Sequence, residues 1–161
     1  MWEMVGVAEE KELYVQKIKE GTVIDHISAG GALSVLKILE IMGHEDNVVS
    51  MAMNVPSHKL GRKDIVKVEG RELNPDEVDK IALIAPRSTI NTVRNYVVVK
   101  KQKPRLPKII RGIVKCVNAT CISNSGEPTE SMFFVENEDP LRMRCYYCNR
   151  YLEKEGIIQQ F

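Results

Sequence analysis

Apolar and polar residues alternate along several short stretches of the chain, and this pattern predicts strands that each bury one face. The clearest stretch spans residues 47–55 and stops before Pro56, a residue type that is disfavoured inside a sheet. Its apolar face consists of Val49, Met51, Met53 and Val55. Residues 64–68 alternate in the same manner after a turn-like segment, so they predict the antiparallel neighbour of the first strand. Two more strands are expected over residues 13–18 and 88–100, which are rich in β-branched and other apolar side chains.

Two helices are predicted between these strands. The first is expected within residues 28–43, because apolar side chains recur there at helical spacing. The side chains expected to face the core are Leu33, Leu36, Leu39 and Met42, with Val35 and Ile38 beside them. The second helix starts after Asn74, which can cap it, with Pro75 as its first residue and Glu77 completing a capping box. Its expected inward residues are Val78, Ile81 and Ala82. Pro86 prevents its continuation.

The resulting order is strand, helix, strand, strand, helix, strand, which is the order of the ferredoxin-like βαββαβ fold. The expected fold class is therefore α+β, with two helices covering one face of a four-stranded antiparallel sheet. The other face of such a sheet stays open to a partner or a ligand. Residues 21–27, which follow the first expected strand, show only weak periodicity and predict no clear element.

A basic, proline-containing segment interrupts this pattern at residues 100–108. Its two prolines and five basic residues favour an extended linker. We therefore expect a flexible tail over residues 1–11, an α+β domain over residues 12–101 and a small β-rich domain over residues 102–161. All four cysteines lie in the last part, and a domain of about 60 residues buries too little surface to be stable unaided.

Composition and charge narrow the classes of function. The chain has 161 residues, of which 43% are apolar and 28% charged, and its formal net charge is only +1. This balance gives no long-range field that would gather nucleic acid or an anionic membrane. No apolar run approaches the roughly 20 residues of a membrane span, and the charged N-terminal residues do not resemble a signal peptide. We therefore expect a cytoplasmic protein whose anion sites are built locally from a few cations.

Four cysteines form two close pairs, Cys116 with Cys121 and Cys145 with Cys148, and 23 residues separate the pairs. A reducing compartment disfavours disulfides. Two such pairs can place four thiolates around one tetrahedral zinc ion, at Zn–S distances of about 2.3 Å. No open coordination position is evident, so the sequence predicts one structural Zn²⁺ per chain within a zinc ribbon.

Other interpretations of the cysteines remain open. Iron could replace zinc with the same ligands. A thioredoxin-like redox pair would stand at a helix start in a βαβ unit, a context that Cys145 and Cys148 lack. Four-cysteine ribbons also occur in RNA-binding proteins, and arginines and tyrosines gather around the second pair here. They are Arg142, Arg144, Arg150, Tyr146, Tyr147 and Tyr151. Such residues could stack bases and hold phosphates, or anchor a protein interface, which the near-zero net charge favours.

Motifs of common enzymes are absent from the sequence. It contains no G-x-x-x-x-G-K-[ST] phosphate loop, no G-x-G-x-x-G, no G-x-S-x-G and no H-E-x-x-H. His44 and His58 stand in segments where turns are expected, and they receive no role. A conventional active site is therefore not visible, and we expect a protein that is not an enzyme.

Several strings of the sequence resemble those of aspartate carbamoyltransferase regulatory chains. They are GTVIDHI at 21–27, NVPS at 54–57, GRKDIVKVE at 61–69, AP at 85–86, TIN at 89–91 and NY at 95–96. The string CVNATCIS at 116–123 and the later C-x-x-C are similar to the zinc domain of that family. The resemblance covers roughly residues 12–160.

This resemblance implies a regulatory function without catalysis. The N-terminal domain would bind nucleoside triphosphates, with CTP (often helped by UTP) as inhibitor and ATP as activator of an enzyme of pyrimidine biosynthesis. The zinc domain would dock on the catalytic chain. Regulatory chains of the family pair as homodimers through their N-terminal domains, and three such dimers join two catalytic trimers in a heterododecamer.

The resemblance also implies site residues, position by position. The implied nucleotide pocket consists of Lys17, Ile18, Val23, Asp25, His26, Lys67, Asn91, Val93, Tyr96, Val98 and Lys101. Within it, Asp25 would hold ribose hydroxyls, Lys67 would reach the base and the sugar, and Lys101 would meet the phosphates. The pocket residues of the last strand fall in two phases, so a bulge or strand break is expected near residues 94–95. The implied docking residues on the zinc loops are Asn118, Tyr147, Asn149 and Arg150.

Overall fold

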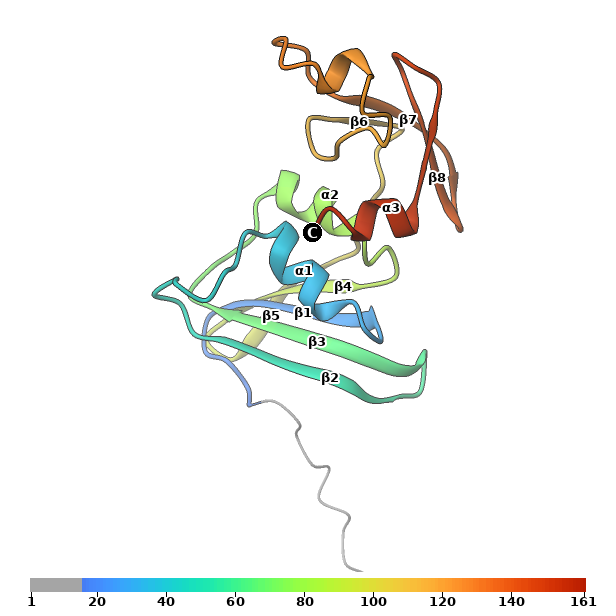
Figure 1. Ribbon diagram of the computed structural model, residues 1–161. Coiled ribbons are helices and arrows are strands. Elements are labelled where there is room, and N and C mark those ends of the chain that lie inside the picture. Colours follow the sequence, from blue (N-terminus) through green and yellow to red (C-terminus); the bar gives the residue numbers. More distant parts are fainter. Residues whose placement is uncertain (1–15) are drawn as a thin grey trace, which may run out of the picture.

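The computed structural model describes residues 16–161, which form two antiparallel sheets joined by an extended segment (Figure 1). The tail expected over residues 1–11 lies outside the described part of the chain. The first sheet contains β1 (Gly21–Ser28), β2 (Val49–Ser57), β3 (Gly61–Glu69), β4 (Thr89–Arg94) and β5 (Val97–Gln102), with the helices α1 (Ala32–Ile38) and α2 (Pro75–Ala82). The second contains β6 (Ile109–Arg111), β7 (Met132–Glu138), β8 (Leu141–Cys145) and β9 (Tyr151–Glu153), followed by α3 (Lys154–Ile158). None of the described helices is long and apolar enough to cross a lipid bilayer.

The strands of the first sheet lie in the order β2-β3-β1-β4-β5, and every neighbouring pair is antiparallel. The first six elements follow one another as strand, helix, strand, strand, helix, strand, and both helices lie on the same side of the sheet (Figure 1). The predicted α+β, ferredoxin-like arrangement is therefore confirmed. The structure adds β5, which extends the predicted four-stranded sheet by one edge strand.

Pairing across the sheet decides which side chains face the helices. Ile24 stands opposite Val66 on one side and Ile90 on the other, and all three are buried. Directly opposed residues of neighbouring strands point to the same face, so these three line the core beneath the helices. Val23 and Lys67, each one position away, point to the other side. This side, which neither α1 nor α2 covers, is called the open face below.

The first strand begins later than the pattern predicts. Residues 16–18, the described part of the strand expected at 13–18, form no strand, so that prediction is wrong. β1 is instead the weakly periodic segment that follows. Its register shifts after Ile24, and His26 within the shift has a positive φ of 56°. A bulge of this kind inserts an unpaired residue, and the alternation of faces is lost at that point.

The last predicted strand is in fact a hairpin. The strand expected over residues 88–100 is divided into β4 and β5 by a turn at Asn95 and Tyr96, whose φ values are 50° and 64°. Two consecutive residues with positive φ match the right-handed twist of the flanking strands. The break predicted near residues 94–95 is therefore confirmed, and the chain runs back along β4 as an edge strand.

α1 is shorter than predicted and turns partly different residues to the core. Its buried residues are Ala32, Val35 and Ile38. Leu33 is 50% exposed, and Met42 lies beyond the end of the helix with 68% of its surface exposed. The predicted inward stripe is therefore wrong at these two positions, and the residues placed beside it are the ones that pack against the sheet.

Asp64 of β3 determines where α1 begins. Its side chain is fully buried, and Oδ2 accepts the backbone N–H groups of Gly30 and Ala32, each at 3.0 Å. Oδ1 accepts the backbone N–H of Asn54 in β2 at 2.8 Å. One carboxylate thus satisfies donors at the start of a helix and inside a neighbouring strand.

β2 is an edge strand, and this explains two differences from the predicted strand. Pro56 lies inside β2 and not after it, because an edge strand tolerates a residue that cannot donate a hydrogen bond. Met51 and Met53 are 44% and 43% exposed, so the strand does not bury a continuous apolar face. A register shift between Ala52 and Val55 breaks the alternation.

α2 has the start and the buried stripe that the sequence predicts. The Asn74 side chain accepts the N–H of Glu77 at 2.9 Å, and Glu77 Oε2 accepts the N–H of Asn74 at 3.0 Å. Pro75 stands in the first turn, and Arg71 forms an ion pair with Glu77 that holds the preceding loop. The buried residues are Val78, Ile81 and Ala82.

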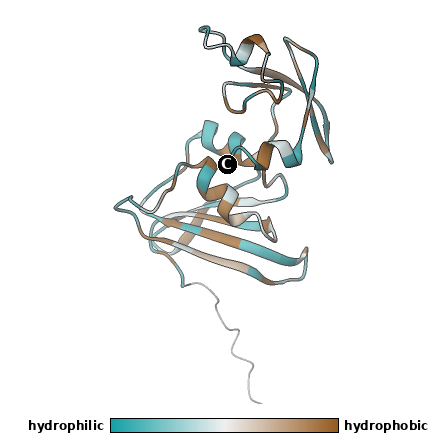
Figure 2. Cartoon of the chain, viewed as in Figure 1, coloured by the Kyte–Doolittle hydropathy of each residue, from teal (hydrophilic) through white to brown (hydrophobic). Residues whose placement is uncertain are grey.

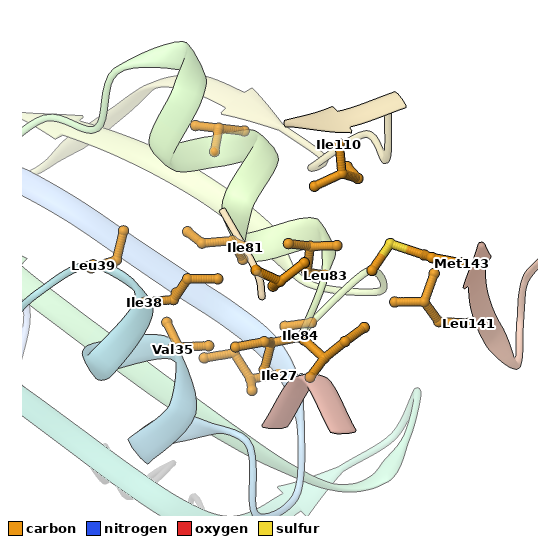
Figure 3. Packing of buried hydrophobic residues seen from close by; sticks show 14 of the residues in the cluster. Ile27, Val35, Ile38, Leu39, Ile81, Leu83, Ile84, Ile110, Leu141 and Met143 are labelled. Atoms are coloured by element: carbon orange, nitrogen blue, oxygen red, sulfur yellow. The ribbon is translucent and has the colours of Figure 1, made fainter. Parts of the chain in front are cut away.

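The two sheets share one apolar core. Ile110 of β6 and Met143 of β8 lie beside Leu83, which follows α2 (Figure 3). Ile157 of α3 is fully buried in the same cluster. Apolar stretches of α1 and α3 also lie near this junction (Figure 2). The second sheet is therefore packed against the helix side of the first and leaves the open face uncovered.

Candidate functional site

A row of five residues crosses the open face of the first sheet in register. Ser50 of β2 stands opposite Lys67 of β3, which stands opposite Val23 of β1. Val23 also stands opposite Asn91 of β4, and Asn91 stands opposite Lys101 of β5. Side chains in such a row are neighbours, with Cβ atoms about 5 Å apart. The row combines two lysines, an amide and a hydroxyl, which suits a ligand that carries both anionic and hydrogen-bonding groups.

A second row lies beside the first. Gly21 of β1 stands opposite Val93, and Val93 stands opposite Val98 across the hairpin. Val98 is 52% exposed, and Tyr96 in the turn is 62% exposed, so this part of the open face offers apolar surface to a ligand. The backbone N–H of Tyr96 donates to the carbonyl oxygen of Lys19 at 3.0 Å, which fixes the turn against the start of β1.

Asp25 of β1 is held by a lysine that the sequence prediction did not include. Lys63 Nζ lies 2.9 Å from Asp25 Oδ1, and the same oxygen accepts the backbone N–H of His26 at 2.6 Å. Burial works to raise the pKa of Asp25, but the hydrogen bonds from Lys63 and His26 and the charge of Lys63 hold it below its usual value. Asp25 is therefore ionised at neutral pH. Its Oδ2 lies 3.9 Å from His26 Nδ1, which is beyond hydrogen-bond distance.

His26 lies in the bulge of β1 and has a buried ring nitrogen. Nδ1 has no hydrogen-bond partner among the described residues. Burial lowers the pKa of His26, and the charges of Lys63, Lys59 and Lys101 lower it further, against the opposing effect of Asp25. The ring is therefore neutral at neutral pH, and its side chain is 25% exposed beside Asp25.

The segment before β1 runs along the open face. Lys67 Nζ donates to the carbonyl oxygen of Gln16 at 2.6 Å, which joins this segment to β3. Burial lowers the pKa of Lys67, and the charge of Asp25 works against that shift. Lys17 is exposed, whereas Ile18 is only 4% exposed. Ile18 is therefore covered, whereas its neighbour Lys17 is open to a ligand.

The structure places most of the predicted nucleotide residues on one face. Those on the open face of the sheet are Val23, Asp25, Lys67, Asn91, Val93, Val98 and Lys101. The others lie next to β1 or β4, with His26 in the bulge, Tyr96 in the turn, and Lys17 and Ile18 before β1. Prediction missed Ser50 and Lys63. The period of two could have found Lys63, because it shares the phase of Lys67, whereas Ser50 depends on the pairing of β2 with β3.

The four cysteines lie together at one end of the second sheet. Cys145 ends β8, and Cys121 directly precedes a turn of 3-10 helix at Ile122–Asn124. All four sulfur atoms lie within 4.8 Å of one another, with 3.5 Å between Cys116 and Cys148 and 3.8 Å between Cys121 and Cys145. Four thiolates at about 2.3 Å from one tetrahedral zinc ion would be about 3.8 Å apart. The arrangement therefore fits a structural zinc ion.

Hydrogen bonds within the two cysteine loops hold this geometry. The side-chain amide of Asn124 donates to the carbonyl oxygens of Cys116 and Asn118, at 2.9 and 2.8 Å. In the loop after β8, Asn149 has a positive φ of 61°, and its N–H donates to the carbonyl oxygen of Cys145 at 3.0 Å. Each loop is thus a closed turn that directs its two sulfurs to the same point.

The thiols of the cluster differ in pKa. Burial raises the pKa of Cys116 to about 12 and raises that of Cys145 as well. For Cys148, burial acts in the same direction, but hydrogen bonds from the N–H of Arg150 and from neighbouring side chains lower the pKa to about 7. A bound divalent cation favours the thiolate form of all its ligands. The redox alternative requires a helix start at the C-x-x-C, and here the pair joins two strands.

The predicted docking residues all lie on the cysteine loops, but three of them, Asn118, Tyr147 and Asn149, have internal side-chain partners. Asn118 Oδ1 accepts hydrogen bonds from the backbone N–H and hydroxyl of Thr120, at 3.2 and 2.9 Å. The Tyr147 hydroxyl donates to the carbonyl oxygen of Glu130 at 3.1 Å. Asn149 and Arg150 are exposed. The two loops can therefore face a partner, although some of these side chains already form hydrogen bonds within the chain.

Two of the three arginines expected in an RNA-binding ribbon, Arg142 and Arg144, are engaged within the second sheet. The Arg142 guanidinium lies 3.7 Å from the centre of the Tyr151 ring. Arg144 donates to Glu136 at 2.6 Å and to Asn149 at 2.8 Å. Both side chains thus already have partners that a phosphate backbone would have to displace, which disfavours the RNA-binding interpretation.

Known proteins resemble this chain over both sheets. The family described as aspartate carbamoyltransferase regulatory chain, allosteric domain, matches residues 13–105, and the metal binding domain of the same chain matches residues 108–158. A relative from Korarchaeum cryptofilum is 55% identical over 152 residues, which are 94% of this chain and 97% of the relative. Relatives from Methanothrix thermoacetophila and Methanothermobacter thermautotrophicus are 57% and 54% identical, over 89% and 93% of this chain and 93% and 96% of their own lengths.

All three relatives are described as aspartate carbamoyltransferase regulatory chains. The allosteric match covers the first sheet with its open face, and the metal-binding match covers the cysteine cluster. A regulatory chain is a non-catalytic subunit, which agrees with the expectation drawn from the sequence motifs. This chain therefore belongs to the family of aspartate carbamoyltransferase regulatory chains.

Proposed function

We propose that this chain is the regulatory subunit of an aspartate carbamoyltransferase of pyrimidine biosynthesis. It binds CTP, UTP or ATP on the open face and holds one zinc ion with Cys116, Cys121, Cys145 and Cys148. Two domains divide the work, with nucleotide bound by residues 12–101 and metal by residues 102–161. The observation that supports the nucleotide site best is the row from Lys67 to Lys101, in which the side chains of Val23 and Asn91 stand between the two lysines.

Each part of a nucleotide has a matching group on the open face. Lys101 at the edge of the sheet takes the phosphates, and Lys67 reaches the base and sugar. Asp25 uses Oδ1 for Lys63 and the N–H of His26, so Oδ2 accepts a ribose hydroxyl. Hydrogen bonds to an ionised carboxylate are roughly twice as strong as those between neutral groups.

The base lies between the hairpin and the segment before β1. Val98 and the exposed ring of Tyr96 supply apolar surface against one side of it, and Val93, which stands opposite Val98, is only 6% exposed. The backbone groups of Lys17 and Ile18 bind its polar edge, where a carbonyl oxygen and an N–H distinguish donors from acceptors. Cytosine and adenine present different edges to these groups, so the same site binds both with different contacts.

The zinc ion acts as a structural cross-link. Bound by all four thiolates, it ties the loop at residues 116–121 to the turn at residues 145–148. Asn118, Tyr147, Asn149 and Arg150 lie on these two loops, so the metal presents them together to the catalytic chain. Two regulatory chains pair as a homodimer, and three such dimers join two catalytic trimers.

The effect of nucleotide binding is transmitted to the catalytic chain through the end of β5. Lys101 belongs to the nucleotide row, and the chain continues from it through residues 103–108 into β6 of the second sheet. A ligand shifts the equilibrium between two states of an assembly only by its differential affinity for them. CTP and ATP therefore act oppositely because each contacts Lys101 and the hairpin differently in the two states.

The decisive experiment combines the zinc-loaded chain with the catalytic trimer and measures aspartate saturation with and without CTP or ATP. The half-saturating aspartate concentration should rise with one nucleotide and fall with the other. In the Lys67→Met variant, the complex with the catalytic trimer should still form. Its affinity for the nucleotide should fall at least about tenfold. Lys115→Met removes an equal charge far from the open face and should leave the response intact. Saturation curves that ignore both nucleotides would refute the regulatory function.

A further inference from the structure

A hollow of about 600 Å³ lies on the helix side of the first sheet, where the end of β5 passes the start of α2. Leu73, Pro75 and Val78 give it an apolar floor. Its cationic lining residues are Lys100, Lys101, Lys103 and Arg105. Asp79 is the one carboxylate among its described lining residues, so the lining carries an excess of positive charge.

None of these four cations forms an ion pair with a carboxylate of the described chain. Elsewhere in the described chain, ion pairs hold Lys63, Arg71, Arg87, Arg94 and Arg144. Four unpaired like charges within six residues of sequence repel one another, and the net charge of the whole chain is only +1. An anion in the hollow relieves this repulsion.

The hollow lies on the opposite side of the sheet from the proposed nucleotide site. Lys100 stands opposite Thr92 and Gln102 stands opposite Ile90, so both point to the helix side. Lys101 stands opposite Asn91 on the open face and contributes to the hollow only because β5 is an edge strand. An anion in the hollow is therefore held by other cations than a nucleotide on the open face.

The size of the hollow selects the class of ligand. Sites for small molecules usually have volumes of about 300–1,000 Å³, with apolar walls and a few polar groups. Lysines and an arginine around an apolar floor match a molecule with several phosphate oxygens and a compact apolar part. A single phosphate would use only part of the charge, whereas two linked phosphates match more of the lining cations.

We infer that this hollow is a second anion site, which binds a small molecule carrying two or more phosphate groups through Lys100, Lys103 and Arg105. This inference goes beyond the proposed nucleotide site and does not depend on it. Lys103 and Arg105 belong to the segment that joins the two sheets, so an occupied hollow also fixes the start of that segment against α2.

The test measures pyrophosphate binding to the full zinc-loaded chain by isothermal titration calorimetry at constant ionic strength. The variant Lys103→Gln/Arg105→Gln should bind pyrophosphate at least about tenfold more weakly than the unchanged chain. The matched control, Lys115→Gln/Lys154→Gln, removes the same charge from exposed positions outside the hollow and should bind as the unchanged chain does. Equal binding by both variants, or equal loss in both, would overturn the inference.

A second variant separates this site from the open face. Lys67→Met should weaken CTP binding but leave pyrophosphate binding unchanged. If pyrophosphate binding were lost in Lys67→Met and kept in Lys103→Gln/Arg105→Gln, the anion would bind on the open face and the inference would be wrong. Failure of CTP to bind at all would refute the proposed nucleotide site and would not affect the pyrophosphate result.

Discussion

Buried charge is the feature that most constrains single residues in this chain. Asp64 is fully buried, and its two oxygens together accept three backbone N–H groups from α1 and β2. Charge-assisted hydrogen bonds offset the cost of taking a carboxylate out of water, but only while every donor is satisfied. The position therefore requires both oxygens of the carboxylate.

Asp64→Asn should lower the free energy of unfolding by about 3 kcal/mol. The side-chain NH2 group of the asparagine would face backbone N–H groups, and it cannot accept hydrogen bonds from them. Urea unfolding with zinc present would measure the loss. Asp46→Asn, on the exposed loop before β2, is the control and should change stability by no more than about 0.5 kcal/mol. Equal, small losses in both variants would show that the Asp64 contacts contribute little.

His26 offers a test of the electrostatics of the open face. Burial and the charge of Lys63 depress its pKa below the usual 6.5. The folded chain disfavours the charged ring, so the unfolded chain binds a proton at His26 more readily. The contribution of His26 to the free energy of unfolding is therefore fully present above pH 6.5 and is lost as the pH falls below 6.5. In Lys63→Gln the ring loses a repulsive neighbour while Asp25 remains, so its pKa should rise. NMR titration of the ring between about pH 5.5 and 8 measures it.

Lys115→Gln provides the comparison for that titration, since Lys115 is not among the groups that shift the pKa of His26. A pKa that stays unchanged in Lys63→Gln would mean that Lys63 does not face the ring in solution.

The cysteines could be predicted from the sequence because residue type and spacing together specify their chemistry. Lys63 and Asp64 could not, since their importance comes from partners that only the pairing of β1 with β3 brings near.

At the scale of elements, local signals were sufficient for α2 and insufficient for α1. The cap of α2 comes from Asn74 and Glu77, three residues apart, so the sequence contains the whole motif. The cap of α1 comes from Asp64, whose partner Gly30 is 34 residues away. Hydrophobic periodicity alone therefore predicted a helix longer than α1 and placed Leu33 on its buried face.

The hairpin between β4 and β5 was missed as two strands because its turn lacks glycine. Asn95 and Tyr96 both adopt positive φ, and for a side chain such as tyrosine this conformation costs about 1–2 kcal/mol. Strain of this kind is often kept where a side chain has a function. Only the phase of the flanking residues indicated a break, through the site residues implied by the family.

Tyr96→Gly should therefore raise the free energy of unfolding by about 0.5–1 kcal/mol while weakening CTP binding. The gain comes from relief of the positive φ, and the loss comes from removing the exposed ring beside the proposed base site. Urea unfolding and calorimetric titration with CTP measure the two effects. A variant that is less stable and binds CTP as before would contradict both assignments.

At the scale of the whole molecule, the two sheets are less independent than the basic linker suggests. Ile110 and Met143 of the second sheet lie beside Leu83 and Ile84 of the first (Figure 3). An ion pair of 3.0 Å between Arg87 and Asp139 adds a contact at the surface. The sequence could not predict this junction, because residues after α2 and on β8 meet only when both sheets have formed.

Metal removal should therefore affect both sheets, to different degrees. Zinc contributes roughly 10–16 kcal/mol to the folding of small zinc domains, far more than the second sheet can gain from its own core. Chelation should abolish amide protection in β6–β9. Amides after α2 should lose part of their protection, since Leu83 loses its cover.

The first sheet should remain folded after chelation, because most of the buried residues of the shared core belong to β1–β5, to α1 and α2 and to the segments that join them. Hydrogen exchange with and without chelator resolves the three responses, and added zinc should restore the original pattern. Arg87→Gln serves as a control, since loss of the exposed ion pair should leave the protection of the zinc-loaded chain nearly unchanged. Strands β6–β9 that stay protected without metal would show that the four cysteines are not needed to hold the docking surface.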